Sequence, residues 1–445
     1  MHYYFYSDKK EPLVKHIKLE NFMGFQYWEH DFYPLTVLAG DNTSGKTTVL
    51  NGIQVALGAI LQCIDELPAN KHFRRQIQED ERYSPFDSFA KGYKPSQGVT
   101  RVSVDSSFDD GHLSWYRELV GSTTSNSRAS VGRLQELVHT VMQQRKLEEN
   151  FKTNYTKESI LPLVLSFGTN RLASQVRTTR ATKERMTRLE RAYKAALMDR
   201  VDFVGAYNWF VEAGKNILEE KEFKGTREAF VNALVTAIPS IYDVDINWAY
   251  GEIEAFIETD NRYIERHRFS QMSDGFKAMM NVVSEIAHRC IELNGFLGEN
   301  AILETPGIVL IDEIDIYLHP KWQRHVLADL RKAFPNIQFI VTTHSPFIIQ
   351  SVSQQELISL DEYANVDGSP QKESLEEIAI RRMGMDKETI RSAKFNEMIE
   401  KAENFYQLIK NGKDVEKDEE LKKLEEEFSD DPAYIALLKA ERKST

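Results

Sequence analysis

The stretch PLTVLAGDNTSGKTTVL, residues 34–50, combines three patterns that together decide the fold. An apolar run comes first, a glycine-rich turn follows, and apolar residues then recur at helical spacing as far as Leu61. The turn, Gly40 to Thr47, fits the pattern of a glycine, four residues and then Gly-Lys-Ser/Thr. Strand, turn and helix in this order predict an α/β fold with a phosphate-binding loop. The residues expected to contact a nucleotide are Gly40, Asp41, Asn42, Thr43, Ser44, Gly45, Lys46, Thr47 and Thr48.

The chemistry of phosphate binding explains the residue types of this loop. Glycines let the backbone curl so that its amides point at phosphate oxygens, and the start of the helix adds about half a positive charge. We expect the Lys46 ammonium to reach the β- and γ-phosphates, and the Thr47 hydroxyl to ligate Mg²⁺. The loop therefore predicts a nucleotide site, and a chance glycine turn is the alternative.

Two later strands end in polar residues that suit the same site. GIVLIDE, residues 307–313, delivers an acidic pair: Asp312 is expected to hold Mg²⁺, and Glu313 to orient or deprotonate the attacking water. IQFIVTT, residues 337–343, ends at His344, which either contacts the γ-phosphate or is a structural histidine. A helix-like segment separates the two strands, and this order predicts a parallel βαβ unit.

The segment MSDGF, residues 272–276, stands directly before a long run of apolar residues at helical spacing. One interpretation is an ordinary helix cap, in which Ser273 or Asp274 satisfies free backbone amides. The other is half of a nucleotide site, in which Ser273, Asp274 and Gly275 meet a nucleotide bound elsewhere.

Composition sets limits on the class of protein. The chain has 445 residues, 41% hydrophobic residues and a formal net charge of −12, which describes an ordinary globular protein and argues against indiscriminate coating of nucleic acid. Cys63 and Cys290 are too few for a disulfide framework or a cysteine metal site. No apolar run approaches the roughly 18 residues of a membrane span, and the N-terminus lacks a signal pattern. We expect a cytoplasmic protein with no membrane contact.

The motifs divide the chain into four expected regions. These are an N-terminal lobe with the phosphate loop (1–130), a helical insert or lid (131–260), a C-terminal lobe with the remaining motifs (261–355) and a helical C-terminal region for oligomer or partner contacts (356–445). The insert carries a basic stretch, interpreted either as a solvated face with salt bridges or as a contact for nucleic acid or nucleotide phosphates. Its basic members are Arg171, Arg177, Arg180, Lys183, Arg185, Arg188, Arg191, Lys194 and Arg200.

In this order, the phosphate loop, the Ser-Asp-Gly helix start, the Asp-Glu strand and the strand-end histidine resemble the ABC-type ATPase head. The resemblance implies a P-loop head with a mixed sheet and flanking helices, binding ATP and Mg²⁺. It further implies two heads packed head to tail around two ATP molecules. Ser273 and Gly275 of one chain would then face the γ-phosphate held by the other. Asp315, just after the acidic pair, is the expected cross-dimer contact.

The chain departs from the family pattern in two places. The usual signature, Leu-Ser-Gly-Gly-Gln, is here Met272-Ser273-Asp274-Gly275-Phe276, and a carboxylate at Asp274 could slow turnover. The family's glutamine loop, a magnesium and water ligand, is not evident. Gly168-Thr169-Asn170-Arg171 occupies its expected place.

Within that family, IKLENF, GDNTSGKTT, MSDGF and DEIDIYLHPKWQ resemble the ATPase subunit of Septu-type anti-phage systems and of retron-linked relatives. This resemblance implies homo-oligomers and a separate HNH nuclease subunit that the ATPase controls. Two other functions are kept open: a stand-alone DNA-repair or recombination ATPase whose basic stretch grips DNA, and a nucleotide-held scaffold with little turnover.

Overall fold

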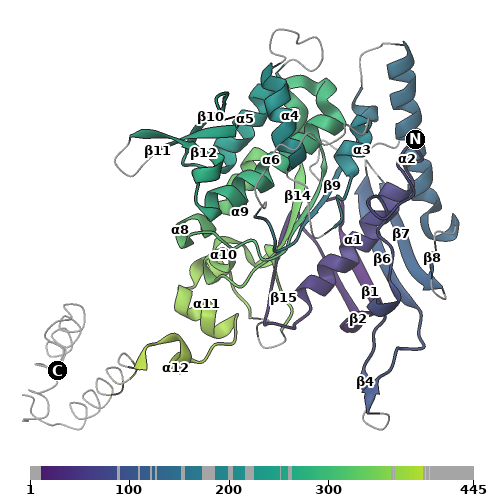
Figure 1. Cartoon of the computed structure of the whole chain (residues 1–445). Coiled ribbons are helices and arrows are strands. Elements are labelled where there is room, and N and C mark those ends of the chain that lie inside the picture. The colour runs from purple at the N-terminus through teal and green to yellow at the C-terminus, as the bar shows by residue number, and fades with distance from the viewer. Residues whose placement is uncertain are drawn as a thin grey trace, which may run out of the picture. The chain divides into compact units, whose positions relative to one another are not determined.

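A computed structural model of the chain places the motifs in one compact unit (Figure 1). It describes residues 12–87, 91–108, 111–120, 123–125, 128–151, 156–172, 186–198, 204–215, 225–250, 252–258, 263–361, 364, 366–393, 396 and 400. The chain divides into two compact units, Met1–Ile378 and Ala379–Thr445. All of the motifs described above lie in the first unit.

A five-stranded parallel sheet, ordered β15-β3-β14-β13-β9, forms the centre of this unit. Its strands are β3 (Leu35–Ala39), β9 (Leu163–Phe167), β13 (Gly307–Ile311), β14 (Ile337–Thr342) and β15 (Leu357–Ser359). All but β15 are buried along their whole length, which explains their continuous apolar sequences. Because the strands run in the same direction, the residues that follow them gather at one edge of the sheet.

A second, antiparallel sheet covers the helix that begins at the phosphate loop. Its order is β2-β1-β6-β7-β8, with bounds β1 (His16–Phe22), β2 (Phe25–Asp31), β6 (Thr100–Phe108), β7 (Gly111–Val120) and β8 (Thr123–Ser125). Helix α1 (Lys46–Gln62) contacts β1, β6 and β7 on one side and β14 on the other (Figure 1). The buried Trp115 indole donates to the main-chain oxygen of Ala56 (2.9 Å). Packing on both sides therefore fixes the position of the helix and of the loop before it.

The opposite face of the parallel sheet is covered by α6 (Asp274–Asn294), which contacts β9 (Figure 1). Around it pack α3 (Arg188–Tyr193), α4 (Val204–Lys215), α5 (Thr226–Ala237) and α7 (Ala301–Glu304), and α5 also contacts α9 (Val326–Ala333).

A three-stranded antiparallel sheet follows α5, with β10 (Ile241–Asn247), β11 (Glu252–Glu258) and β12 (Ile264–Arg268). The remaining elements are β4 (Phe86–Asp87), β5 (Gly92–Tyr93), α2 (Arg128–Phe151), α8 (Pro320–Gln323), α10 (Pro346–Ser351), α11 (Leu375–Arg381) and α12 (Lys387–Ile390).

Buried Gln338 on β14 joins the parallel sheet to the segments that flank the antiparallel one. Its side-chain oxygen accepts from the Val14 amide (2.9 Å), and its side-chain nitrogen donates to the main-chain oxygens of Val14 (2.9 Å) and Tyr33 (3.1 Å). The amide thus bonds backbone groups of two residues that lie outside the strands. The two sheets are therefore held together by directed bonds as well as by apolar packing.

The predicted α/β fold, the strand before the phosphate loop and the parallel pairing of β13 with β14 are confirmed. The segment 131–260 contributes β9 to the central sheet in addition to its helices. Residues 401–445 of the expected helical C-terminal region lie outside the described residues. Within the described part of the chain, no helix is both long and apolar enough to cross a bilayer.

Candidate functional site

The loop between β3 and α1 has the backbone that phosphate binding requires. Gly40, Thr43 and Gly45 have φ angles of 152°, 78° and 100°, which turn the chain tightly into the helix. The Lys46 ammonium donates to the main-chain oxygens of Gly40 (2.8 Å) and Asp41 (2.7 Å), so it lies inside the loop. Burial lowers the pKa of Lys46, and the nearby Asp361, Asp312 and Glu313 carboxylates oppose that shift.

Two residues that sequence motifs did not indicate also support the loop. A Cβ atom on Gly45 would lie 2.4 Å from the Phe25 ring, so this ring closes directly over the loop backbone. The Asp41 amide donates to the Asp361 carboxylate (2.7 Å). Asp361 follows β15, the neighbour of β3, so its position at the same edge of the sheet is the signal that could have identified it.

Thr47 and Asp312, predicted as the magnesium ligands, lie next to each other. The Thr47 hydroxyl donates to one oxygen of the Asp312 carboxylate (3.3 Å), and the Thr342 hydroxyl donates to the other (2.6 Å). A hydroxyl and a carboxylate are hard oxygen ligands, and Mg²⁺ completes its shell with phosphate and water. Within the described residues, no group of three or more His, Cys, Asp or Glu side chains offers a metal cage. As hard oxygen ligands, the Thr47 hydroxyl and the Asp312 carboxylate suit Mg²⁺ that is bound together with a nucleotide.

Glu313 follows Asp312 in a strained conformation. Its φ is 48°, in the left-handed region, which costs a residue with a Cβ roughly 1 kcal/mol. Its amide donates to the Thr342 hydroxyl (2.7 Å), so the end of β14 holds this turn from one side. The same strand end places His344 beside the turn, where its amide donates to the Asp315 carboxylate (3.3 Å). The structure thus brings the acidic pair, Asp315 and His344 together.

Asp315 is bonded within its own chain. Its carboxylate also accepts from the Thr343 hydroxyl (2.6 Å). The expected contact of Asp315 across a dimer therefore stays a prediction, and the observed bonds assign it to fixing the loop after the acidic pair.

The MSDGF motif forms the start of α6 as expected, but Ser273 does not cap the helix with its side chain. Ser273 is the residue before α6, it is exposed, and within the described structure its side chain makes no capping hydrogen bond. Asp274, also exposed, is the first residue of the helix. A Cβ on Gly275 would lie 2.6 Å from the Tyr317 main-chain oxygen, so only glycine allows the loop after the acidic pair to pack here. The exposed side chains at this helix start are free to meet a ligand.

The motif also packs on the segment that follows the acidic pair. Phe276 meets Trp322 of α8 edge to face, with ring centroids 4.5 Å apart. In the described part of the chain, no hydrogen bond joins Ser273 or Gly275 to the phosphate loop.

The basic stretch that begins at Arg171 was interpreted as a solvated face or as a contact for phosphates. Arg171 itself fits neither interpretation. Arg171 is 3% exposed and donates to main-chain oxygens, so the interpretations as a solvated or phosphate-binding residue are wrong for it. Arg188 and Arg191 are partly exposed and pair with the buried Glu292 (3.4 and 3.0 Å), as a salt-bridged face predicts. Arg177, Arg180, Lys183, Arg185 and Arg200 lie outside the described residues.

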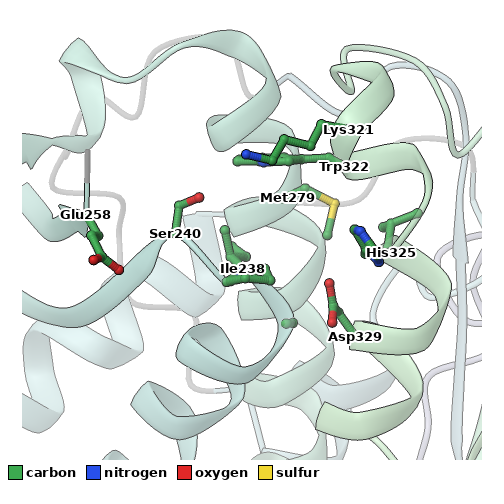
Figure 2. A pocket seen from close by; sticks show the side chains of 11 residues that line it. Ile238, Ser240, Glu258, Met279, Lys321, Trp322, His325 and Asp329 are labelled. Carbon is green, nitrogen blue, oxygen red and sulfur yellow. The ribbon is translucent and has the colours of Figure 1, made fainter. Parts of the chain in front are cut away.

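A cavity of about 260 Å³ lies beside the motif helix (Figure 2). Met279 of α6 and Trp322 of α8 line it, with carboxylates from Glu258 and Asp329. Lys321 is also part of the lining, as Figure 2 shows. Burial raises the pKa of Asp329, an effect that nearby cations oppose. The lining thus carries both signs of charge.

This parallel sheet, with its glycine loop and the Thr47–Asp312 pair at one edge, defines a P-loop domain of the ATPase class. Comparisons with known proteins agree. A family model described as "AAA domain, putative AbiEii toxin, Type IV TA system" matches residues 158–350. Another, described as "AAA domain", matches residues 16–230.

Curated proteins with Septu and retron names are similar to this chain. The chain is 21% identical over 435 residues to the Septu protein PtuA of Bacillus mycoides (strain KBAB4), covering 94% of this chain and 51% of that one. It is 29% identical over 214 residues to the Septu protein PtuA of Bacillus thuringiensis, covering 42% of this chain and 50% of that one. It is 47% identical over 91 residues to the Retron Vc95 probable ATPase of Vibrio cholerae serotype O1 biovar El Tor, covering 20% of this chain and 17% of that one.

The chain therefore spans about half the length of the PtuA relatives and less than a fifth of the retron one. The predicted resemblance to Septu and retron ATPases is confirmed. Among solved structures, an SMC head bound to the C-winged helix domain of ScpA superposes with a TM-score of 0.45 at 16% identity, covering 78% of this chain and 94% of that one.

Thr342→Val tests the geometry of the metal pair. The change removes the hydroxyl that bonds both Asp312 and Glu313 while keeping the shape of the side chain. We expect the affinity for ATP with Mg²⁺ to fall about tenfold, as the loss of one to two hydrogen bonds implies. The affinity measured in EDTA should stay the same, because the phosphate loop is untouched.

Titration of a fluorescent ATP analogue measures both affinities. Thr36→Val is the matched control, since Thr36 is an equally buried threonine of the same sheet whose hydroxyl bonds the backbone of Tyr33. Equal loss with and without Mg²⁺ would contradict the assignment of Asp312 to the metal.

Proposed function

We propose that the chain binds ATP with Mg²⁺ at the loop Gly40–Thr48 and hydrolyses it. The observation that carries this proposal is the Thr47–Asp312 contact of 3.3 Å, with Glu313 next in the chain. Thr47 and Asp312 would hold the metal, Lys46 would meet the β- and γ-phosphates, and Glu313 would activate water with His344 nearby. Relatives named probable ATPases support the same activity.

Two copies of the chain would complete each nucleotide site. Ser273 is exposed directly before a 21-residue helix, and its side chain makes no capping hydrogen bond in the described structure. The backbone amides at this helix start favour an anion. Gly275 lets this helix start pack closely on the loop after the acidic pair. Under two-fold symmetry, the Ser273–Gly275 motif of each copy faces the phosphate loop of the other, and ATP joins the copies. Asp274 adds a negative charge at this point and makes turnover slow.

The proposed biological role is the control of a separate effector. Relatives named for Septu and retron systems support a cytoplasmic ATPase in antiviral defence that regulates an HNH-type nuclease subunit. Assembly around ATP would present the surface that the nuclease recognises. The bonds of Arg171, Arg188 and Arg191 within the chain favour this role over a stand-alone repair ATPase that grips DNA.

Glu313→Gln tests hydrolysis. The amide cannot accept a proton from water, so we expect turnover to fall about a hundredfold or more while ATP stays bound. Phosphate release and retained nucleotide, measured on the same sample, separate the two effects. Glu299→Gln, an exposed change elsewhere, should behave as wild type. Equal turnover in Glu313→Gln and wild type would remove Glu313 from the mechanism.

Ser273→Arg tests pairing. A bulky cation at this exposed position would block a second copy from closing on ATP, without touching the phosphate loop of its own chain. In a Glu313→Gln background, light scattering should show ATP-dependent pairing that Ser273→Arg abolishes. Asn300→Arg adds the same side chain at another exposed position and should leave pairing intact. If Ser273→Arg pairs normally, the motif is only the start of a helix.

A further inference from the structure

We propose that Arg171 is a positioning residue that holds the backbone of the acidic pair and connects it to the motif helix α6. The inference rests on the proposed hydrolysis and adds a regulatory link within the same site. Arg171 follows β9, the strand next to β13. Its buried side chain acts on Asp312 and Glu313 through their main-chain oxygens.

The contacts of the guanidinium define this role. One terminal nitrogen donates to the main-chain oxygens of Gly168 (3.1 Å) and Asp312, and the other to the main-chain oxygen of Glu313 (2.6 Å). The planar guanidinium presents several donors in a fixed fork, so one side chain can hold two successive carbonyls at a set angle. No other ionised side chain type has this geometry. Lysine would offer a single point of attachment.

The backbone at this point needs such a support. Glu313 has its φ at 48°, and its amide is already held by the Thr342 hydroxyl (2.7 Å). Arg171 holds the carbonyl of the same residue from the opposite side of β13, because β9 and β14 flank that strand. Together the two side chains fix both ends of the residue that would activate water. Without Arg171, we expect Glu313 to lose the orientation that hydrolysis requires.

A second bond extends the link to α6. The Asn281 side chain, in the second turn of α6, donates to the main-chain oxygen of Arg171 (3.0 Å), and both residues are buried. The helix that begins at the Ser273 motif is thus joined through Asn281 and Arg171 to the carbonyl of Glu313. A displacement of α6, when the motif engages a second copy, would reach the acidic pair through these two bonds. Hydrolysis would in this way depend on pairing.

The cost of the arrangement indicates that it serves the site. Burial lowers the pKa of Arg171, while Asp312 and Asp315 oppose that shift, and arginine stays charged in proteins. A buried charge held mainly by backbone carbonyls is expensive compared with an apolar side chain of similar volume. Arg289 provides a comparison: it is also 3% exposed and donates to the carbonyls of Ala192 and Lys194, but it lies far along α6 and pairs with Glu285.

The experiment compares Arg171→Lys with the matched control Arg289→Lys in the full chain. For Arg171→Lys we expect kcat to fall about tenfold or more, the loss of roughly one charged hydrogen bond, with KM changed less than about threefold. The gain in ATP affinity on adding Mg²⁺ should shrink, while affinity in EDTA is unchanged. Arg289→Lys should keep the wild-type kcat, KM, Mg²⁺ gain and affinity in EDTA. Free guanidinium ion should raise the kcat of Arg171→Ala and leave that of wild type unchanged.

The outcomes separate this inference from the proposed function. If wild type hydrolyses ATP and Arg171→Lys keeps its kcat and its Mg²⁺ gain, the positioning role is overturned and the ATPase stands. If wild type shows no turnover, the proposed hydrolysis fails. The gain in ATP affinity on adding Mg²⁺ then decides the role of Arg171. A smaller gain in Arg171→Lys than in wild type supports the positioning of Asp312, and an equal gain overturns it.

A second variant covers the case in which changes at Arg171 prevent folding. Asn281→Leu leaves the guanidinium in place and breaks only the bond to α6. It should lower the stimulation of turnover by pairing, measured as activity against protein concentration, without changing ATP affinity. Unchanged concentration dependence would overturn the link to α6.

Discussion

The hydrogen bond between the Thr47 hydroxyl and the Asp312 carboxylate depends on the whole architecture of the first unit. The two residues are 265 positions apart in the chain. Thr47 is placed by α1, which is packed between two sheets, and Asp312 by β13, which is separated from β3 by β14. Parallel pairing brings the ends of these strands to one edge, and a slip of one residue in β13 would turn Asp312 to the other face. The proposed metal site therefore exists only if the register of the central sheet is correct.

Around this contact, buried polar side chains form hydrogen bonds that orient the acidic pair, which apolar packing alone would not do. Thr342 bonds both the carboxylate of Asp312 and the amide of Glu313, and Arg171 bonds the carbonyls of the same two residues. The strained φ of Glu313 is thus fixed from two neighbouring strands. Strain of this kind persists where the surroundings determine it fully, and it is concentrated at functional sites. The rigid acidic pair and the exposed Ser273 motif are consistent with a site that becomes complete only when a second copy arrives.

Much of this could be predicted from sequence because the decisive patterns are local. The loop before α1, the acidic pair after β13 and the histidine after β14 each follow a continuous apolar run, and parallel topology explains why they meet. Phe25 and Asp361 were missed because long-range packing brings β2 and the end of β15 to the loop. Arg171 was misjudged for the same reason: it begins a basic run typical of a solvated face, but β9 carries it into the core beside β13. A run of basic residues in the sequence does not tell which of them are buried, because burial depends on how the strands are arranged in the sheet.

The central claim is that each nucleotide site is shared by two copies, and a mixing experiment tests it most directly. Lys46→Ala lacks a working phosphate loop, and Ser273→Arg lacks a working motif, so each alone should be inactive. In a mixed pair, the loop of the Ser273→Arg chain meets the intact motif of the Lys46→Ala chain, and one complete site forms. A mixed pair carries the blocking arginine at only one of its two interfaces, whereas a pair of Ser273→Arg chains carries it at both. If half of the pairs are mixed and each has one complete site of two, the mixture should regain up to about a quarter of the wild-type ATP turnover. A mixture that stays as inactive as its components would contradict the account.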